Sequence, residues 1–376
     1  MHRCDVLIIG AGPAGSATAL ALHAHAPALR VTMLGGGQPQ VRPVGEVLPA
    51  LARSLLAHLG AWPAFVQAVF LPVHASAAAW GQQHVIENHF IHSARGHGWH
   101  LDRNRFDALL QAQAVAAGTS LLPARRLQTA TRTPAGWLVL LDDGSQLAAR
   151  FLVDASGRQA VLARQLGVVR QRPDKLAAYL AYVPNLPGSD PRTLIEARPD
   201  GWWYTAPLPG GERVIACLSD ADLGRRSGLQ QTQHWQARLA ATRWTHAAAG
   251  DIALHAASID VRPAGSARLE HACGDGWLAA GDAASSFDPL SSQGISKALR
   301  SGIFAAYALA DWLLAADNKG LARYRAVIDV EFADYLRLHA QYYQQEQRWA
   351  DAPFWQRRHA GRAIAAGTRQ LGASAA

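Results

Sequence analysis

A glycine-rich turn close to the N-terminus restricts this chain to a small number of folds. The motif GAGPAG occupies residues 10–15, after the apolar run Val6–Gly10 and before the Ala/Leu-rich stretch Ser16–His25. This order predicts a β-strand, a tight turn and a helix. Such a unit binds the pyrophosphate of a dinucleotide, because the amides at the start of the helix face the anion.

Each glycine of this motif has an expected role. Gly10 permits the tight turn, Gly12 lets the backbone approach the phosphates, and Gly15 lets the helix pack closely on the strand. Pro13 and Ala14 lie between these glycines and are expected to line the same site. A glycine-rich turn without a ligand is the alternative, and the strand and helix on either side favour nucleotide binding.

Composition favours a soluble enzyme over a nucleic-acid-binding or membrane protein. The 376 residues suffice for two large lobes, and the formal net charge of +8 comes almost entirely from scattered arginines. Nucleic acid would require a clustered basic stripe, so we expect no such partner. The longest apolar stretch, 302–316, contains Asp311 and is too short to span a membrane.

The cysteines and histidines give no sign of a disulfide framework or a metal site. Cys4, Cys217 and Cys273 are far apart, and the sixteen histidines show no HExxH pattern. We therefore expect a reducing, cytoplasmic location. Because the first strand begins by Cys4, we also expect no signal peptide.

The apolar patterns predict an α/β (α+β) fold in three parts. A Rossmann-like nucleotide-binding domain carries an inserted β-sheet domain, and helices follow at the C-terminus. The expected ranges are 1–75, 95–165 and 265–315 for the first, 76–94 and 166–264 for the second, and 316–376 for the helical region.

Several segments have a clear expected structure. Trp80–Ile91 alternates like a strand, and 102–117 has a helical period with Phe106, Leu109, Leu110 and Ala114 on its apolar face. Residues 142–144 are expected to form a hairpin turn. Strands are also expected at 151–154, 178–183, 202–207, 214–218 and 277–281, and three C-terminal helices are expected to break near Asn318 and 351–353.

The second strand, Arg30–Leu34, ends without the acidic residue that usually binds the adenosine ribose. It runs into three glycines that begin at Gly35, and no Asp or Glu lies between Asp5 and Glu46. Either a backbone or amide group, such as Gln38 or Gln40, holds the ribose, or this contact is absent.

Five separated segments carry a resemblance to a known superfamily. They are GAGPAG at 10–15, VGEVLP at 44–49, RNRFD at 103–107, LVDASGR at 152–158 and GDAASSFDPLSSQG at 281–294. In this order and spacing they resemble the FAD-dependent monooxygenases and flavin halogenases, whose fold is like that of p-hydroxybenzoate hydroxylase. The resemblance covers nearly the whole chain and implies FAD as the cofactor.

The resemblance implies which residues bind FAD. Gly10, Gly12 and Gly15 would hold the pyrophosphate, Arg103 the phosphates or ribityl chain, and Asp282 of the Gly281–Asp282 pair the ribityl hydroxyls. The isoalloxazine would lie against a turn and a helix N-terminus that stabilises negative charge on the reduced ring. That turn and helix start comprise Pro289, Ser292, Gln293, Gly294 and Ile295.

The remaining implied positions have structural alternatives. Asp154 and Gly157 match a short element that contacts both cofactor and domain core, and Glu46 would shape flavin access or cap the following helix. The alternative for Asp282 is a helix cap or turn residue, and the alternative for Arg103 is a surface arginine in the first turn of a helix. The resemblance further assigns Gly35, Arg42 and Leu127 to the cofactor site.

The electron donor is expected to bind transiently. We find one dinucleotide motif and no second glycine fingerprint for NAD(P)H. In this superfamily NAD(P)H binds briefly or a separate flavin reductase supplies the electrons, and dioxygen is the oxidant. The protein must then position the substrate and exclude water.

Two segments bear on the substrate. In GWWYTAPLP at 201–209, Trp202 and Tyr204 would point to the opposite strand face from Trp203, toward either a substrate pocket or the core. Flavin halogenases have W-x-W-x-I-P here and a functional lysine some thirty residues after the VGEVLP-like segment. This chain has no lysine in 73–85, and its first is Lys175, so halogenation is disfavoured.

The C-terminal run YYQQEQRWADAPFWQRRH at 342–359 resembles a halogenase-like subgroup that contains the maturation flavoproteins of tryptophylquinone enzymes. These act on a tryptophan of a partner polypeptide. The structural alternative is a helical clamp that packs on the FAD domain, with Trp349, Phe354 and Trp355 as its core anchors.

Four functions remain open at this point. An aromatic hydroxylase could act on a tryptophan side chain of a partner protein or on a small aromatic molecule. A flavin-dependent reductase or desaturase has the same fold and is the third possibility. The fourth is a non-catalytic FAD-binding accessory protein for cofactor maturation. No general base can be assigned, although His97 and His100 lie near the motifs.

The missing ribose-binding acid gives a first testable prediction. Loss of a charged hydrogen bond weakens binding by about 1.5–3 kcal/mol, so we expect looser FAD binding than this fold usually gives. Titration of the apoprotein with FAD should give a dissociation constant above the micromolar level. A sub-micromolar value would contradict the prediction.

Overall fold

The computed structural model describes residues 2–35, 46–90, 96–186, 188–250 and 259–360. The chain has the mixed α/β structure that the sequence predicts. It divides into two compact units, and each is described by itself. Unit 1 consists of Met1–Phe70, Leu101–Pro173 and Ser266–Phe332; unit 2 consists of Leu71–His100, Asp174–Gly265 and Ala333–Ala376.

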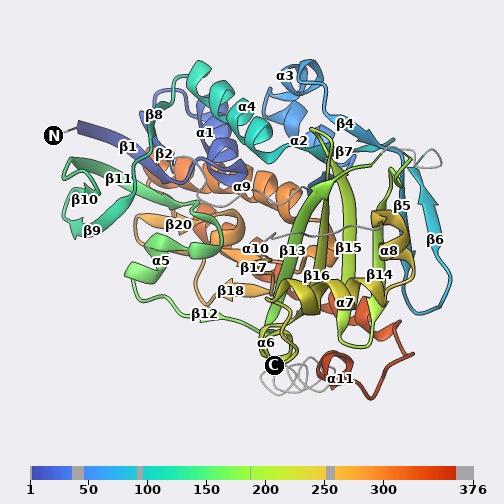
Figure 1. Cartoon of the computed structure of the whole chain (residues 1–376). Helices are drawn as coiled ribbons and strands as arrows, with labels where there is room; N and C mark the ends of the chain where they lie inside the picture. Colours follow the sequence, from blue (N-terminus) through green and yellow to red (C-terminus); the bar gives the residue numbers. More distant parts are fainter. Residues whose placement is uncertain (1, 36–45, 91–95, 187, 251–258, 361–376) are drawn as a thin grey trace. The chain divides into compact units, whose positions relative to one another are not determined.

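A largely parallel sheet forms the centre of unit 1 (Figure 1). Strand β1 pairs in parallel with β2 on one side and with β11 on the other, which is the geometry of a nucleotide-binding fold. The strand order is β19 (Cys273–Gly274), β20 (Trp277–Ala279), β11 (Gln146–Asp154), β1 (His2–Ile9), β2 (Val31–Gly35) and β8 (Ser120–Pro123).

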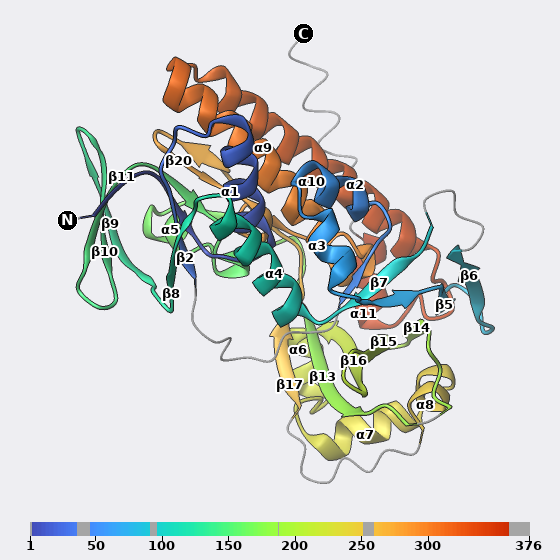
Figure 2. The ribbon, with the colours of Figure 1, turned by 90° about the horizontal axis from the view of Figure 1, so that it is seen from above.

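Three helices of unit 1 lie side by side, with α1 in the middle (Figure 2). They are α4 (Arg103–Ala116), α1 (Pro13–His25) and α9 (Gly294–Ala315). Helix α1 starts with Pro13, whose fixed φ suits a first helical position. Helix α4 is capped by Asp102, whose side chain accepts a hydrogen bond from the Arg105 amide.

Glycine permits the close packing of α1 on α9. A Cβ at Gly302 would lie 2.5 Å from the Ala14 carbonyl oxygen, so a larger residue there would push the helices apart. By length and composition α9 is the one helix among the described residues that could cross a membrane. However, 61% of its apolar window is buried, which is typical of a core helix in a soluble enzyme fold.

An antiparallel hairpin extends the main sheet of unit 1. Strands β9 (Leu127–Thr133) and β10 (Gly136–Leu141) pair with each other, and β10 also pairs with β11. The predicted turn at 142–144 connects β10 to β11, with Gly144 at φ +82°. The sequence prediction is confirmed here.

The other elements of unit 1 are short apart from the start of α10. They are β3 (Glu46–Leu48), α2 (Ala52–His58), α3 (Trp62–Gln67), α5 (Val161–Gln165), β12 (Arg170–Gln171), β18 (Ala267–Leu269), β21 (Ser285–Ser286) and the first part of α10 (Lys319–Gln344).

Unit 2 is built on a second, mainly antiparallel sheet. The strand order is β17 (Asp260–Pro263), β13 (Leu176–Pro184), β16 (Glu212–Asp220), β15 (Gly201–Leu208), β14 (Thr193–Arg198), β5 (Ala75–Ala79) and β6 (Ile86–His89). The three strands predicted at 178–183, 202–207 and 214–218 are therefore confirmed. The remaining elements are β4 (Leu71–Val73), β7 (Gly98–Leu101), α6 (Ala221–Arg226), α7 (Thr232–Ala240), α8 (Trp244–Ala249), α11 (Pro353–Ala360) and the end of α10.

Two expectations differ from the structure. Trp80–Ile91 is not one strand. Strand β5 ends at Ala79, a turn that contains Gly81 at φ +72° follows, and β6 occupies only Ile86–His89. The C-terminal helices are also not a separate region, since unit 1 includes residues up to Phe332 and unit 2 the rest. The predicted breaks near Asn318 and 351–353 do separate α9, α10 and α11.

Aromatic side chains anchor the C-terminal segment within unit 2. The Trp355 indole is fully buried and donates a hydrogen bond to the Arg198 carbonyl at 2.8 Å. It lies edge-on to Trp80, with ring centroids 5.4 Å apart. Phe354 and Trp355 are completely buried, as expected of core anchors, whereas Trp349 is only partly buried. The contacts described for Trp355 lie within unit 2, so packing of this segment on the FAD domain stays a prediction.

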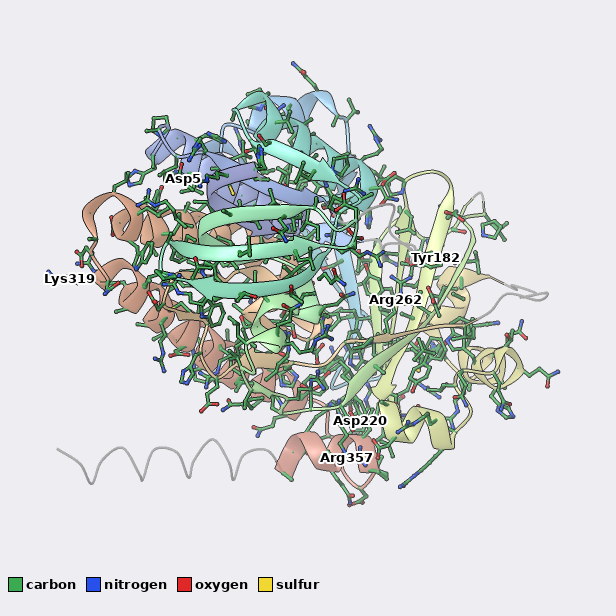
Figure 3. The ribbon with its side chains drawn as sticks, turned by 90° about the vertical axis from the view of Figure 1, so that its left-hand side faces the viewer. Asp5, Tyr182, Asp220, Arg262, Lys319 and Arg357 are labelled. Atoms are coloured by element: carbon green, nitrogen blue, oxygen red, sulfur yellow. The ribbon has the colours of Figure 1, made fainter. Side chains whose placement is uncertain are left out.

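Charge pairing closes the same segment. Arg357 donates to Asp220 at 2.8 Å, and both residues are labelled in Figure 3. Arg358 also bonds Asp220, again at 2.8 Å. Because Asp220 is buried and paired twice, helix α11 is fixed against the end of β16.

This clamp generates a stability prediction. Trp355→Ala should lower the free energy of unfolding by about 3–5 kcal/mol, because it leaves a cavity and removes a buried hydrogen bond. The matched control is Val330→Ala at a position that is 62% exposed, which should change stability by less than about 0.5 kcal/mol. Denaturant unfolding followed by tryptophan fluorescence measures both, and equal effects would show that the clamp contributes little.

Candidate cofactor site

Unit 1 contains a cavity of about 1280 Å³ at the carboxyl ends of its parallel strands. This exceeds the 300–1,000 Å³ typical of drug-sized ligand sites and suits an extended dinucleotide. Its walls include the turn after β1, the end of β2, one face of α4, the loop after β8, residues 155–157 and the start of α9. Ligands of open α/β sheets bind at this edge.

The glycine turn has the geometry expected of a phosphate cradle. Gly10 has φ +110°, and a Cβ there would lie 2.4 Å from the Ala155 carbonyl oxygen. A Cβ at Gly15 would lie 2.0 Å from the Gly10 carbonyl oxygen, whereas one at Gly12 would meet no atom within 4 Å. Gly10 and Gly15 are therefore required by the fold, and Gly12 leaves open space in front of the α1 N-terminus.

Most of the predicted cofactor residues line this cavity, and some do not. Those that line it are Gly10, Gly12, Pro13, Ala14, Gly35, Arg103, Leu127, Gly157, Asp282, Gly294 and Ile295. Those among the described residues that do not line it are Gly15, Asp154, Gly281, Pro289, Ser292 and Gln293. Arg42, Gln38 and Gln40 lie outside the described residues, as does the side chain of Glu46.

Asp154 holds the loop rather than facing the cavity. Its buried carboxylate accepts hydrogen bonds from the Ser156 amide, the Ser156 hydroxyl and the Ala163 amide. These bonds fix Ser156 and Gly157, which do line the cavity. The geometry therefore supports a structural role for Asp154 in the domain core rather than direct contact with a ligand.

Four polar residues of α4 line the cavity: Arg103, Asn104, Asp107 and Gln111. Arg103 pairs with Asp107 at 3.3 Å, one helical turn away. Burial raises the pKa of Asp107, although the Arg103 charge opposes this shift. Gln111 donates to the Ala11 carbonyl at 2.9 Å and so ties α4 to the glycine turn.

Asp282 lies at the centre of a cluster of positive charge. Lys297 Nζ is 2.8 Å from its Oδ1, and Arg158 Nε is 3.5 Å from its Oδ2. Arg170 donates to the Asp282 backbone carbonyl at 2.8 Å. Lys297 is 1% exposed, bonds the Ser285 carbonyl, and has its Nζ 4.5 Å from the Phe287 ring centroid.

This cluster keeps the Asp282 carboxylate ionised. Burial opposes ionisation, but the charges of Lys297, Arg158 and Arg170 outweigh it and hold the pKa of Asp282 below its ordinary value. Burial also lowers the pKa of Lys297, against the opposing pull of Asp282. Three cations surround one carboxylate, so this part of unit 1 favours a ligand with negative charge.

The sequence reading missed Lys297, Arg158 and Arg170 as partners of Asp282. The sequence does contain a pattern that could have identified Lys297. It is one of three lysines in the chain, and it follows Gly294 by three residues, in the first turn of the predicted helix. The two arginines have no such signal, because their proximity to Asp282 arises only from the fold.

The predicted pocket role of Trp202 is wrong. Both faces of β15 are covered, and Trp202 is 1% exposed with its indole nitrogen donating to the Tyr343 hydroxyl at 2.9 Å. Trp203 packs on Trp235 on the other face, with centroids 5.1 Å apart. Tyr204 is half-buried, and its role stays a prediction.

Of the histidines considered as bases, His100 is almost completely buried. Burial lowers its pKa to about 4, with a weaker contribution from the Arg213 charge, while a hydrogen bond to the Pro191 carbonyl opposes the shift. It is therefore neutral near pH 7.

Comparison with known proteins identifies the family. The model of the tryptophan halogenase family matches residues 72–371. A putative FAD-dependent oxidoreductase, LodB of Marinomonas mediterranea, is 32% identical over 97% of this chain and 99% of its own length. The chain belongs to the tryptophan halogenase family. It is an FAD-dependent oxidoreductase.

Solved structures of the family share this fold. One is QhpG, described as a peptidyl tryptophan dihydroxylase essential for tryptophylquinone cofactor biogenesis. It is 29% identical, with a TM-score of 0.80 over 95% of this chain and 78% of that one. CmlS, a flavin-dependent halogenase, is 24% identical, with a TM-score of 0.82 over 95% of this chain and 68% of that one.

The cavity fits FAD as this family uses it. The open position at Gly12 leaves room for a pyrophosphate, Arg103 contributes a cation to the same cavity lining, and Asp282 is an ionised acceptor that could bind hydroxyl groups. Gly294 and Ile295 place the N-terminus of α9 on the same cavity. We expect these residues to hold the cofactor.

Two glycine substitutions separate binding from folding. Gly12 has φ −76° and free space around it, so Gly12→Ala should leave the unfolding midpoint unchanged. Because the added methyl occupies the phosphate position, FAD affinity should fall about tenfold or more, or about 1.4 kcal/mol.

Gly15→Ala is the contrasting variant. Its Cβ would collide with the Gly10 carbonyl, so it should destabilise the fold by about 1–3 kcal/mol. Thermal unfolding of the apoproteins and FAD titration measure the two effects. Loss of stability in Gly12→Ala, or unchanged FAD affinity there, would refute this assignment.

Proposed function

We propose that this chain is an FAD-dependent monooxygenase that hydroxylates a tryptophan side chain of a partner polypeptide. The observation that carries the proposal is the similarity to QhpG over 95% of the chain at 29% identity, since QhpG is described as a peptidyl tryptophan dihydroxylase. The indole ring is electron-rich, so it is a natural acceptor for an oxygen atom delivered by a reduced flavin.

The lysines of the chain argue against halogenation. The segment 73–85, where flavin halogenases place their functional lysine, contains none. Of the three lysines in the chain, Lys297 is buried and its Nζ is held by Asp282 and the Ser285 carbonyl. It is therefore not free to carry a halogen atom, and hydroxylation needs no such group.

The proposed reaction consumes dioxygen and NAD(P)H. One oxygen atom is inserted into an aromatic C–H bond, and the other leaves as water with two electrons from NAD(P)H and a proton from solvent. The electrons arrive by transient NAD(P)H binding or from a separate flavin reductase. FAD, when bound, supplies the activated oxygen.

The chain's own residues would bind and polarise the cofactor. The amides at the α1 N-terminus would face the pyrophosphate, and the three cations around Asp282 with the α9 N-terminus would favour negative charge on the reduced ring. The three cysteines are unpaired, which agrees with the proposed cytoplasmic location.

A direct assay tests the proposal. The FAD-loaded protein, NADH, a flavin reductase and isotopically labelled dioxygen are incubated with a tryptophan-containing polypeptide encoded beside this chain's gene. Mass spectrometry should show one or two labelled oxygen atoms on a tryptophan of that polypeptide. The control is Gly12→Ala protein, whose fold is expected to be intact.

Other outcomes identify the alternatives. Labelled oxygen on a free indole or a small aromatic, with none on the polypeptide, would favour a small-molecule hydroxylase. Incorporation of bromide or chloride in place of oxygen would refute hydroxylation. Absence of NADH oxidation with every acceptor would favour a non-catalytic FAD-binding protein.

A further inference from the structure

The adenosine end of the cavity has an unusual charge pattern. In this fold the adenosine ribose lies beyond the carboxyl end of β2, where an acidic side chain usually binds it. Here that strand ends at Gly35, and the acids that line the described cavity are Asp107 and Asp282. Each is paired with a cation, Arg103 and Lys297 respectively.

The loop after β8 brings arginines to this end instead. Gly35 pairs with Pro123 in the sheet, and the Arg125 amide donates to the Gly35 carbonyl at 3.2 Å. Arg126 follows directly, with its amide and carbonyl both bonded to Asp142. Its backbone is thus fixed beside the end of β2, and its side chain lines the cavity.

A second arginine comes from α5. This helix packs on β9, and Gln165 Nε2 donates to the Gln128 carbonyl at 2.9 Å. Arg164, the neighbour of Gln165, and Leu127, the neighbour of Gln128, both line the cavity. Two segments far apart in the sequence, the loop after β8 and α5, therefore each contribute an arginine, Arg126 and Arg164, to the lining of one cavity.

These two guanidinium groups differ from the other arginines of the cavity. Arg103 is paired with Asp107, and Arg125 Nε is 2.8 Å from Asp143. Neither Arg126 nor Arg164 has a side-chain ion pair or hydrogen bond within the described residues, and both are exposed to solvent. Their donors are available to a ligand.

We propose that Arg126 and Arg164 bind the adenosine half of FAD in place of the missing acid and so offset part of the affinity lost with it. An acid accepts hydrogen bonds from the ribose hydroxyls, whereas a guanidinium donates to the ribose oxygens and to the nitrogen acceptors of adenine. A cationic end also accepts a phosphate on the ribose, which an acid would repel. The inference rests on the FAD site and is independent of the aromatic substrate.

Binding measurements on the apoprotein test this inference. The double variant Arg126→Ala/Arg164→Ala should bind FAD about tenfold more weakly than the wild type, which corresponds to about 1.4 kcal/mol. Arg323→Ala, an exposed arginine of α10 outside the cavity lining, should leave the affinity unchanged. FMN has no adenosine, so its affinity should be the same in all three proteins.

Competition against bound FAD gives a second readout. The adenosine bisphosphate that carries 2′- and 5′-phosphates should displace FAD from the wild type at a lower concentration than adenosine 5′-diphosphate does. The double variant should lose this preference. Because both arginines are exposed, its unfolding midpoint should match that of the wild type.

The outcomes separate this inference from the FAD assignment. Equal FAD affinity in the wild type and the double variant would overturn the role of the arginines and leave FAD binding intact. An equal loss of FMN affinity would also overturn it, because the effect would not be specific to adenosine. A wild-type protein that binds neither FAD nor FMN would overturn both conclusions.

Discussion

The close approach of backbone at the GAGPAG turn is the constraint on which unit 1 depends. The Gly10 carbonyl lies where a side chain on Gly15 would be, and the Ala155 carbonyl lies where one on Gly10 would be. Beside this turn, Gly302 of α9 allows that helix to approach the Ala14 carbonyl at the start of α1. These contacts place the N-termini of α1 and α9 on one cavity, and both ends favour an anionic ligand.

Charge then distinguishes the two ends of that cavity. Asp282 stays ionised because Lys297, Arg158 and Arg170 outweigh the cost of its burial, so one carboxylate faces the ligand within a positive surrounding. No acid among the described lining residues adjoins Gly35 in the chain, and Arg126 and Arg164 contribute unpaired cations to the cavity. The cavity is thus predominantly cationic, in keeping with a ligand that carries a diphosphate.

Local sequence patterns were sufficient for the elements that hold the site. The strand, turn and helix at 2–25, the capped helix α4 and the hairpin turn at 142–144 follow from apolar period, capping and turn residues. The family and its cofactor followed from the order of five motifs. The prediction of a single strand at Trp80–Ile91 is wrong because the residues alternate like a strand although Gly81, with its positive φ, forms a turn.

Long-range contacts could not be predicted in this way. Trp202 is of a residue type expected in a pocket for an aromatic substrate. However, Tyr343, which is distant in sequence, packs on it and accepts its hydrogen bond. The partners of Asp282 come from three separate segments, and Arg126 and Arg164 line one cavity only through the fold. Such proximity depends on the whole topology and leaves no mark in a local window.

A crystal structure of the protein grown with excess FAD tests the central claim most directly. We expect density for one FAD whose diphosphate lies against the backbone at Gly12 and whose ribityl chain reaches Asp282. Its adenosine should extend past Gly35 toward the loop after β8. A cavity closed by side chains around Gly12, or FAD bound elsewhere with this turn empty, would contradict the account.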